Sequence, residues 1–282
     1  MTGISAALRP CPPTAWHDAR VDVPDLSGYR PSAEVLRRVR DVTFVAVVGP
    51  SAAGKTTVIN AARRRDTGLH FIRTDLDREP RQDEQDGVDL HFRTRAEMLA
   101  GIRDGRFLTV VAHLSGHLYA TDGAEYRPGG LAIMPVLSSA LPVFRALPFR
   151  SQHTVFLTPP SYSAWMTRLA SRQFAEVQRA QRLAEARQSL EFALADPAVR
   201  HVISDDVGRA TDDLLDLVHG DAHAAQPEPV AQRARATIRE LLRQLRGPVA
   251  APALGTGGRV DSDRVDSDRV DGGANVGVRG RA

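Results

Sequence analysis

The sequence predicts an α/β fold in which a parallel sheet is flanked by helices. The chain has 282 residues, of which 42% are hydrophobic, which is enough for one sizeable core. A nearly uncharged run, VTFVAVV at 42–48, leads directly into a glycine-containing loop and then into a helix-compatible stretch. Apolar runs and stretches of helical composition then alternate along the chain, which is the order typical of a parallel sheet covered by helices.

Residues 1–40 are expected to form an N-terminal extension that is partly disordered, because they contain several prolines and no apolar periodicity. A short helix is expected within this extension, at 32–41. The core domain is expected at 41–222. After the strand at 42–48, its further strands are expected at 106–114, 129–137, 151–160 and 200–206. Its helices are expected at 55–65, 94–105, 163–172, 175–195 and 208–220, with Gly220 just past the end of the last one.

The segment 223–248 is expected to contain a basic helix, with apolar residues at helical spacing over 229–247. Such a helix could bind an acidic partner or a membrane surface, but packing of its apolar stripe on the core is the favoured interpretation. The remainder, 249–282, repeats RVDSD at 259–263 and 264–268 and has few large apolar residues, so a disordered tail is expected.

Composition narrows the class of protein. The net charge of +3 is too small to indicate a nucleic-acid partner. Cys11 is the only cysteine, so no intrachain disulfide and no cysteine-rich zinc site is expected, as in a reducing compartment. No apolar run is long enough for a signal peptide or a membrane span. The expectation is a cytoplasmic protein that binds small molecules and neither membranes nor nucleic acids.

GPSAAGKT at 49–56 matches the phosphate-binding loop G-x-x-x-x-G-K-[ST], with strand and helix on the correct sides. The glycines allow the backbone to approach phosphate oxygens, and the helix that follows points its first amides at the anion. The motif predicts a P-loop NTPase that uses ATP and Mg²⁺, with the Thr56 hydroxyl as a metal ligand. The predicted nucleotide-binding residues are Gly49, Ser51, Ala52, Ala53, Gly54, Lys55, Thr56 and Thr57.

Lys55 is the only lysine among 37 basic residues, and all the others are arginine. A loop that wraps closely around the β- and γ-phosphates needs a compact ammonium on a flexible stem, not a planar guanidinium. The single lysine therefore occupies the position where arginine is the poorest substitute, and we predict that Lys55 is catalytic.

Three further motifs follow this loop along the chain. GPSAAGKTT is followed by REPRQDEQDGVDLHF, by GRFLTVVAHLSGHLYAT and by FLTPPSYSAWMTRLASR, and together these resemble the guanylate kinase family over roughly residues 42–220. The resemblance implies a P-loop kinase fold with an inserted acceptor-binding segment and a helical lid. It also implies transfer of the γ-phosphoryl group of ATP to GMP or a related phosphomonoester.

The resemblance assigns an acceptor site and a lid. Arg78 and Arg81 fall on the two phosphate-binding arginines, which suit a terminal phosphate because each can donate forked hydrogen bonds. Lid arginines close over the transferring group and stabilise its charge. The remaining acceptor residues implied are Thr74, Tyr119 and Thr121, and the lid arginines, which act in catalysis, are Arg168, Arg172 and Arg182. SDDVGRA at 204–210 resembles the stretch that borders adenine, with Ser204 in place of asparagine.

Three departures from the family concern the acceptor. A tyrosine that binds phosphate is Leu90 here, the glutamate that reads guanine is replaced at Thr109 or Val110, and no acid occupies AIMPV at 132–136. Loss of both carboxylates is expected to weaken selection of guanine, since base discrimination depends on paired hydrogen bonds in a desolvated pocket.

These departures leave alternatives open. Ribose 1,5-bisphosphate phosphokinases share part of the pattern, with His113 at a histidine of their acceptor segment, so a sugar-phosphate kinase is the second interpretation. His113 could equally be a core histidine satisfied by the backbone. A third interpretation is a non-catalytic guanylate kinase-like interaction module, although such modules typically lose the phosphate loop that is intact here.

Overall fold

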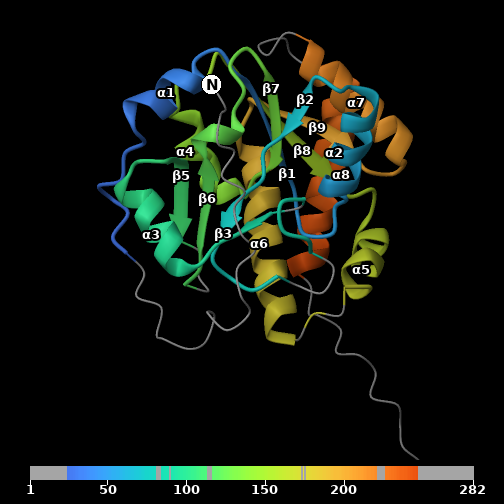
Figure 1. Cartoon of the computed structure of the whole chain (residues 1–282). Helices are drawn as coiled ribbons and strands as arrows, with labels where there is room; N and C mark the ends of the chain where they lie inside the picture. The colour runs from blue at the N-terminus through green and yellow to red at the C-terminus, as the bar shows by residue number, and fades with distance from the viewer. Residues whose placement is uncertain are drawn as a thin grey trace, which may run out of the picture. The chain divides into compact units, whose positions relative to one another are not determined.

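Two sheets organise the chain, for which the computed structural model describes residues 24–80, 84–88, 90–112, 116–172, 174, 176–220 and 226–246. The first sheet has five strands in the order β2-β7-β1-β8-β9, and every pairing in it is parallel (Figure 1). Its strands are β1 Thr43–Val48, β2 Leu69–Phe71, β7 Leu131–Pro135, β8 Ser151–Thr158 and β9 Val199–Ile203. The predicted α/β class is confirmed.

Helices cover both faces of this sheet, because β1 presents apolar side chains to each face. Val45 and Val47 point to a face packed by α2 Lys55–Arg65 and α7 Val207–His219. Phe44, Ala46 and Val48 point to the opposite face, where α5 Tyr162–Ala170, α6 Glu176–Ala195 and α8 Glu228–Arg246 pack with α1 Ala33–Val39 and α4 Leu141–Arg145. A continuous apolar run is needed because both faces are buried.

The second sheet is smaller and corrects one expectation. It has the order β4-β3-β6-β5, with β3 Asp75–Leu76, β4 His91–Phe92, β5 Phe107–Ala112 and β6 Leu118–Asp122. The strand predicted at 106–114 thus exists as β5, but it pairs antiparallel with β6 instead of joining the parallel sheet. Only five residues separate the two strands, whereas a parallel connection needs a crossover of roughly a dozen residues or more.

Helix α3 Arg95–Arg103 covers the second sheet, and its N-terminus is a capping box. The Thr94 hydroxyl accepts from the Glu97 amide, and the Glu97 carboxylate accepts from the Thr94 amide. Met98 on α3 packs with Phe107, Val110 and Leu118 in a core of their own. The segment between β2 and β7 is therefore a separately packed insertion, beginning with β3 and ending near the 3₁₀ helix Gly123–Glu125.

Helix α8 packs its apolar stripe on the first sheet. Ile238, Leu241 and Leu242 are buried there together with Trp165 of α5 and Leu190 of α6. The whole tail expected at 249–282, and residues 1–23 of the N-terminal extension, lie outside the described residues. Among the described helices, none is long and apolar enough to cross a membrane.

Candidate active site

The loop between β1 and α2 is shaped by its two glycines. Gly49 has a φ of 146°, and a Cβ at this position would lie 2.6 Å from the Leu157 carbonyl oxygen, so only glycine fits. Gly54 has a φ of 95° and caps α2 without a side-chain hydrogen bond. The first amides of α2 therefore have no side-chain cap at this position and are available to an anion. Ala52 holds a left-handed φ of 63°, an uncommon conformation for alanine that the tight turn imposes.

Lys55 folds back onto this loop. Its Nζ donates to the Gly49 carbonyl at 2.6 Å and to the Pro50 carbonyl at 3.0 Å. Burial, as the largest cause, and the positive charges of Arg172 and Arg182 together lower the pKa of Lys55 to about 8, while Glu185 acts in the opposite direction. A cation held beside two other cations, with only carbonyl oxygens as partners, is a site suited to a polyanionic ligand.

This arrangement predicts a measurable titration. Because Lys55 is the only lysine in the chain, protein labelled with [¹³Cε]lysine has a single ε-carbon resonance. Its titration midpoint is expected near pH 8 in the free protein, and saturating MgATP is expected to move it above pH 10, since phosphate charge favours the ammonium. Between these two values ATP binding takes up protons, by the usual linkage of charge and binding. A midpoint that ATP does not move would contradict the placement of phosphate at Lys55.

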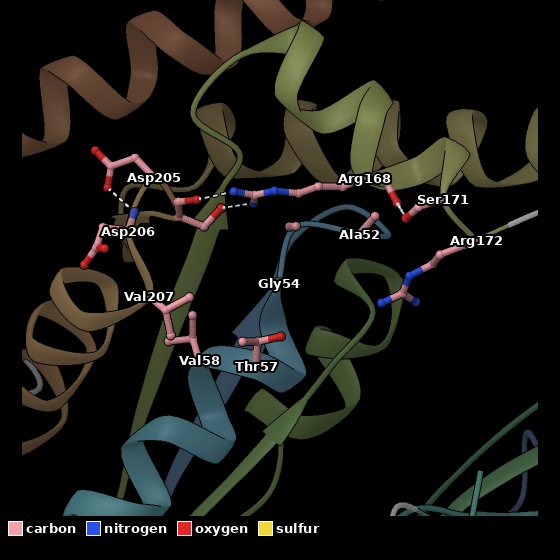
Figure 2. Close-up of a pocket in the computed structure, with 12 residues that line it drawn as sticks. Ala52, Gly54, Thr57, Val58, Arg168, Ser171, Arg172, Asp205, Asp206 and Val207 are labelled. Atoms are coloured by element: carbon pink, nitrogen blue, oxygen red, sulfur yellow. Dashed lines mark hydrogen bonds between the residues drawn. The ribbon is translucent and has the colours of Figure 1, made fainter. Parts of the chain in front are cut away.

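A pocket of about 330 Å³, here called the outer pocket, lies on one side of the loop. Its walls are the loop and the start of α2, the predicted lid helix α5 and the β9–α7 segment (Figure 2). The residues that line it include Ala52, Ala53, Gly54, Thr57, Arg168, Arg172, Ser204, Asp205 and Asp206. Four of the predicted nucleotide-binding residues are thus brought together with two predicted lid arginines.

The two lid arginines of the outer pocket differ in their contacts. Arg168 donates from Nη1 to the Ser204 hydroxyl at 3.2 Å and from Nη2 to the Ser204 carbonyl at 2.9 Å, so it joins α5 to the β9–α7 segment. Arg172, just past the end of α5, is exposed and extends into the pocket (Figure 2). No hydrogen bond or ion pair joins the Arg172 guanidinium to another described residue. Its guanidinium is therefore available to a ligand.

Helix α5 is also hydrogen-bonded to the phosphate loop. The Trp165 indole N–H donates to the Ser51 carbonyl at 2.8 Å, and Trp165 is fully buried. Ser51, predicted as a nucleotide contact, thus offers its carbonyl to α5. This bond sets the position of α5, and of the arginines that follow it, relative to the phosphate loop.

A second pocket of about 400 Å³, the central pocket, lies on the other side of the loop. It is lined by Gly49, Pro50, Ser51 and Lys55, by the end of β5, by residues 137–139 after β7, and by Glu185, Gln188 and Ser189 of α6. Arg182 of α6 donates from Nη1 to Glu185 Oε2 at 2.8 Å. The charges of Arg172, which lines the outer pocket, and of the Arg182–Glu185 pair both act on Lys55.

A third pocket of about 90 Å³, the threonine pocket, adjoins the central pocket. The two share Val111 and Leu137. Three predicted acceptor residues, Thr74, Tyr119 and Thr121, line the threonine pocket. Its remaining lining residues are Thr109, Val111, Ala120, Met134, Pro135, Val136, Leu137, Ala140 and Phe144.

Arg78 lies at the Tyr119 side of this pocket. Its guanidinium forms a two-pronged ion pair with Glu84, from Nη1 to Oε2 at 2.6 Å and from Nη2 to Oε1 at 2.7 Å. Burial disfavours the charged form, but the Glu84 carboxylate and the Tyr119 hydroxyl outweigh that effect, and the pKa of Arg78 is raised. Arg78 is thus a fixed cation beside Tyr119.

Arg81 and His113 lie outside the described residues, so their positions stay predictions. Thr56 is exposed at the second position of α2. Sequence reasoning overlooked Glu84, Glu185 and Trp165. Glu185 follows Arg182 by three residues on a predicted helix, which is a recognisable pairing signal. Glu84 and Trp165 carried no such local signal.

Comparisons with known proteins identify the family of this chain. The family model described as guanylate kinase matches residues 41–218. A guanylate kinase from Mycobacterium leprae (strain TN) is 34% identical over 182 residues, which are 62% of this chain and 85% of that protein. A guanylate kinase from Rhodococcus jostii (strain RHA1) is 34% identical over 196 residues, covering 67% of this chain and 92% of that protein.

Among solved structures, a guanylate kinase from Anaplasma phagocytophilum is similar with a TM-score of 0.49 and 17% identity, covering 72% of this chain and 93% of that chain. The family model covers more than half of the chain, and the relatives are matched over most of their length. The chain belongs to the guanylate kinase family.

Proposed function

We propose that this protein transfers the γ-phosphoryl group of MgATP to a purine nucleoside monophosphate, with GMP as the first acceptor to test. The observation that carries the proposal is that the phosphate loop lines two pockets, with Lys55 in the wall of the central one. The outer pocket has the loop and Arg172, and the central pocket leads to the threonine pocket and Arg78. A donor phosphate on Lys55 would face an acceptor phosphate held by Arg78.

In this proposal the protein positions charge and performs no covalent chemistry of its own. Lys55 would bind the β- and γ-phosphates, and Arg172 and Arg182 would stabilise the charge that spreads over the transferring group. Arg168 would hold the lid in place through Ser204. Arg78, Tyr119 and the unplaced Arg81 would hold the acceptor phosphate in line.

The loop residues fit the magnesium ion that such a reaction needs. Among the described residues, no group of three or more His, Cys, Asp or Glu side chains could hold a metal. That suits Mg²⁺, which is bound through substrate phosphates, water and one or two protein oxygens. The Thr56 hydroxyl, exposed beside Lys55, would be the protein ligand. When bound, Mg²⁺ supplies positive charge to the phosphate oxygens.

The function is tested by ADP release from ATP in the presence of GMP, dGMP, AMP or ribose 1,5-bisphosphate. We expect ADP release with GMP. The matched family and the relatives named above are guanylate kinases, which does not favour the sugar-phosphate alternative. A folded protein that releases no ADP with any acceptor would contradict the proposal and favour an interaction module.

Replacement of Arg78 separates acceptor binding from donor binding. Arg78→Ala is expected to raise the KM for the acceptor by about ten- to a hundredfold, because a charge-assisted hydrogen-bond pair contributes roughly 1.5–3 kcal/mol. The KM for ATP is expected to change little. Steady-state kinetics with each substrate varied in turn measures both values.

Arg103→Ala is the matched control, since Arg103 is exposed on α3 of the same insertion. It is expected to behave like the unmodified protein. An unchanged acceptor KM in Arg78→Ala would show that the acceptor phosphate binds elsewhere.

A further inference from the structure

We infer that the threonine pocket reads an acceptor purine through neutral hydroxyl groups, so that IMP is an acceptor comparable to GMP. This inference rests on the proposed function and concerns the acceptor that the same site selects. Thr74, Thr109, Tyr119 and Thr121, each with a hydroxyl, line the pocket, and among the described residues that line it none has a carboxylate or an amide side chain.

The hydroxyl groups are held in a fixed arrangement. Thr109 on β5 lies opposite Thr121 on β6, and their Oγ1 atoms are 2.9 Å apart. The Tyr126 hydroxyl, fully buried behind them, donates to Thr121 Oγ1 at 3.4 Å. Thr121 can then donate to Thr109, which leaves the Thr109 proton and a lone pair for a ligand.

Strand register decides that Thr109 occupies this place. The β5–β6 pairing shifts between Phe107 and Thr109, and successive side chains of a strand point to opposite faces. Thr109 therefore lines the pocket, whereas Val110 packs in the core of the insertion with Met98. The neighbouring apolar residues Val111, Met134 and Phe144 supply surface for a flat ring.

The hydrogen-bonding groups of guanine explain why we expect little discrimination between GMP and IMP. Guanine presents two kinds of donor on one edge, N1–H and the 2-amino group, and one carboxylate can accept from both. Hypoxanthine, the base of IMP, keeps N1–H and O6 but lacks the 2-amino group. A hydroxyl such as Thr109 can accept from N1–H or donate to O6, and both bases offer these atoms. The 2-amino group can gain at most a neutral hydrogen bond here.

The test compares kcat/KM for GMP and IMP with MgATP. We expect the two values to lie within about tenfold of each other, the range of one neutral hydrogen bond. Thr109→Glu introduces a carboxylate on the same strand position and is expected to raise the GMP to IMP ratio by at least about tenfold. Thr109→Val, which keeps the branched shape and removes the hydroxyl, is expected to lower both values and leave their ratio unchanged.

A preference of the unmodified protein for GMP of a hundredfold or more would overturn the inference, as would a folded Thr109→Glu protein with an unchanged ratio. If Thr109→Glu does not fold, the ratio of kcat/KM for GMP to that for IMP in the unmodified protein still tests the inference. Calorimetry with Lys55→Ala protein measures the ratio of the affinities for GMP and IMP without turnover. A protein that binds both nucleotides equally but releases no ADP would therefore refute the proposed function, while the inferred reading of the base by neutral hydroxyl groups would stay supported.

Discussion

Lys55→Ala is expected to lower kcat for ADP formation by about a thousandfold or more, since loss of one preorganised charge at a developing anion costs roughly 10²–10³ and this residue also positions the donor. The physical reason lies in its surroundings: the Nζ atom donates to two carbonyls of its own loop, and the charges of Arg172 and Arg182 act on it. Rapid-quench or coupled-enzyme measurement of ADP release at saturating ATP gives the value.

Lys55→Arg tests the steric argument separately from the charge. A guanidinium keeps the positive charge but is planar and larger than an ammonium, so this variant is expected to be nearly as inactive as Lys55→Ala. Arg64→Ala, an exposed residue on the same helix, is the control and is expected to keep full activity. If Lys55→Arg retained a tenth of the activity or more, the geometric explanation for the single lysine would be wrong.

Arg172→Ala is expected to lower kcat by about a thousandfold, because an arginine that stabilises the transferring phosphoryl group contributes roughly 10³–10⁵ to the rate. Its side chain lines the outer pocket, has no hydrogen-bond partner among the described residues, and lowers the pKa of Lys55 by its charge. The dissociation constant for ATP is expected to rise only a few-fold, since the contribution belongs to the transition state. Single-turnover kinetics and calorimetry separate the two effects.

Arg168 provides the comparison for Arg172. Because Arg168 donates two hydrogen bonds to Ser204, Arg168→Ala is expected to lower the melting temperature as well as the rate, whereas Arg172→Ala is expected to leave the melting temperature unchanged. If the kcat of Arg172→Ala stayed within tenfold of that of the unmodified protein, Arg172 would have no role in phosphoryl transfer.

The extent of sequence prediction can be seen at particular residues. The guanylate kinase family, predicted from four linked motifs, is confirmed by the family model and the relatives. The phosphate loop could be predicted because its residues are contiguous and its geometry is local, with Gly49 and Gly54 in backbone conformations that favour glycine. The pairing of β5 could not, because an apolar run shows that a strand is buried without showing its partner.

The residue that faces the acceptor at the position of the family glutamate could not be predicted from the sequence either. The sequence placed a threonine and a valine where the family has a glutamate, and could not say which of them faces the ligand. The irregular register between β5 and β6 directs Thr109 into the pocket and Val110 into the core. A shift of one residue exchanges the two faces of a strand, so this detail depends on pairing across the sheet.

By itself, the sequence determined the fold class, the family and the position of the phosphate loop, since each depends on residue order along short segments. The tertiary structure alone decided that the charges of Arg172 and Arg182 act on Lys55, that Arg168 is joined to Ser204, and that Thr109 contacts Thr121. These residues are far apart in the chain, and only the packing of α5, α6 and two sheets brings them together. Distances between such groups set pKa values and selectivity, which is why the chemistry of the site could not be obtained from motifs.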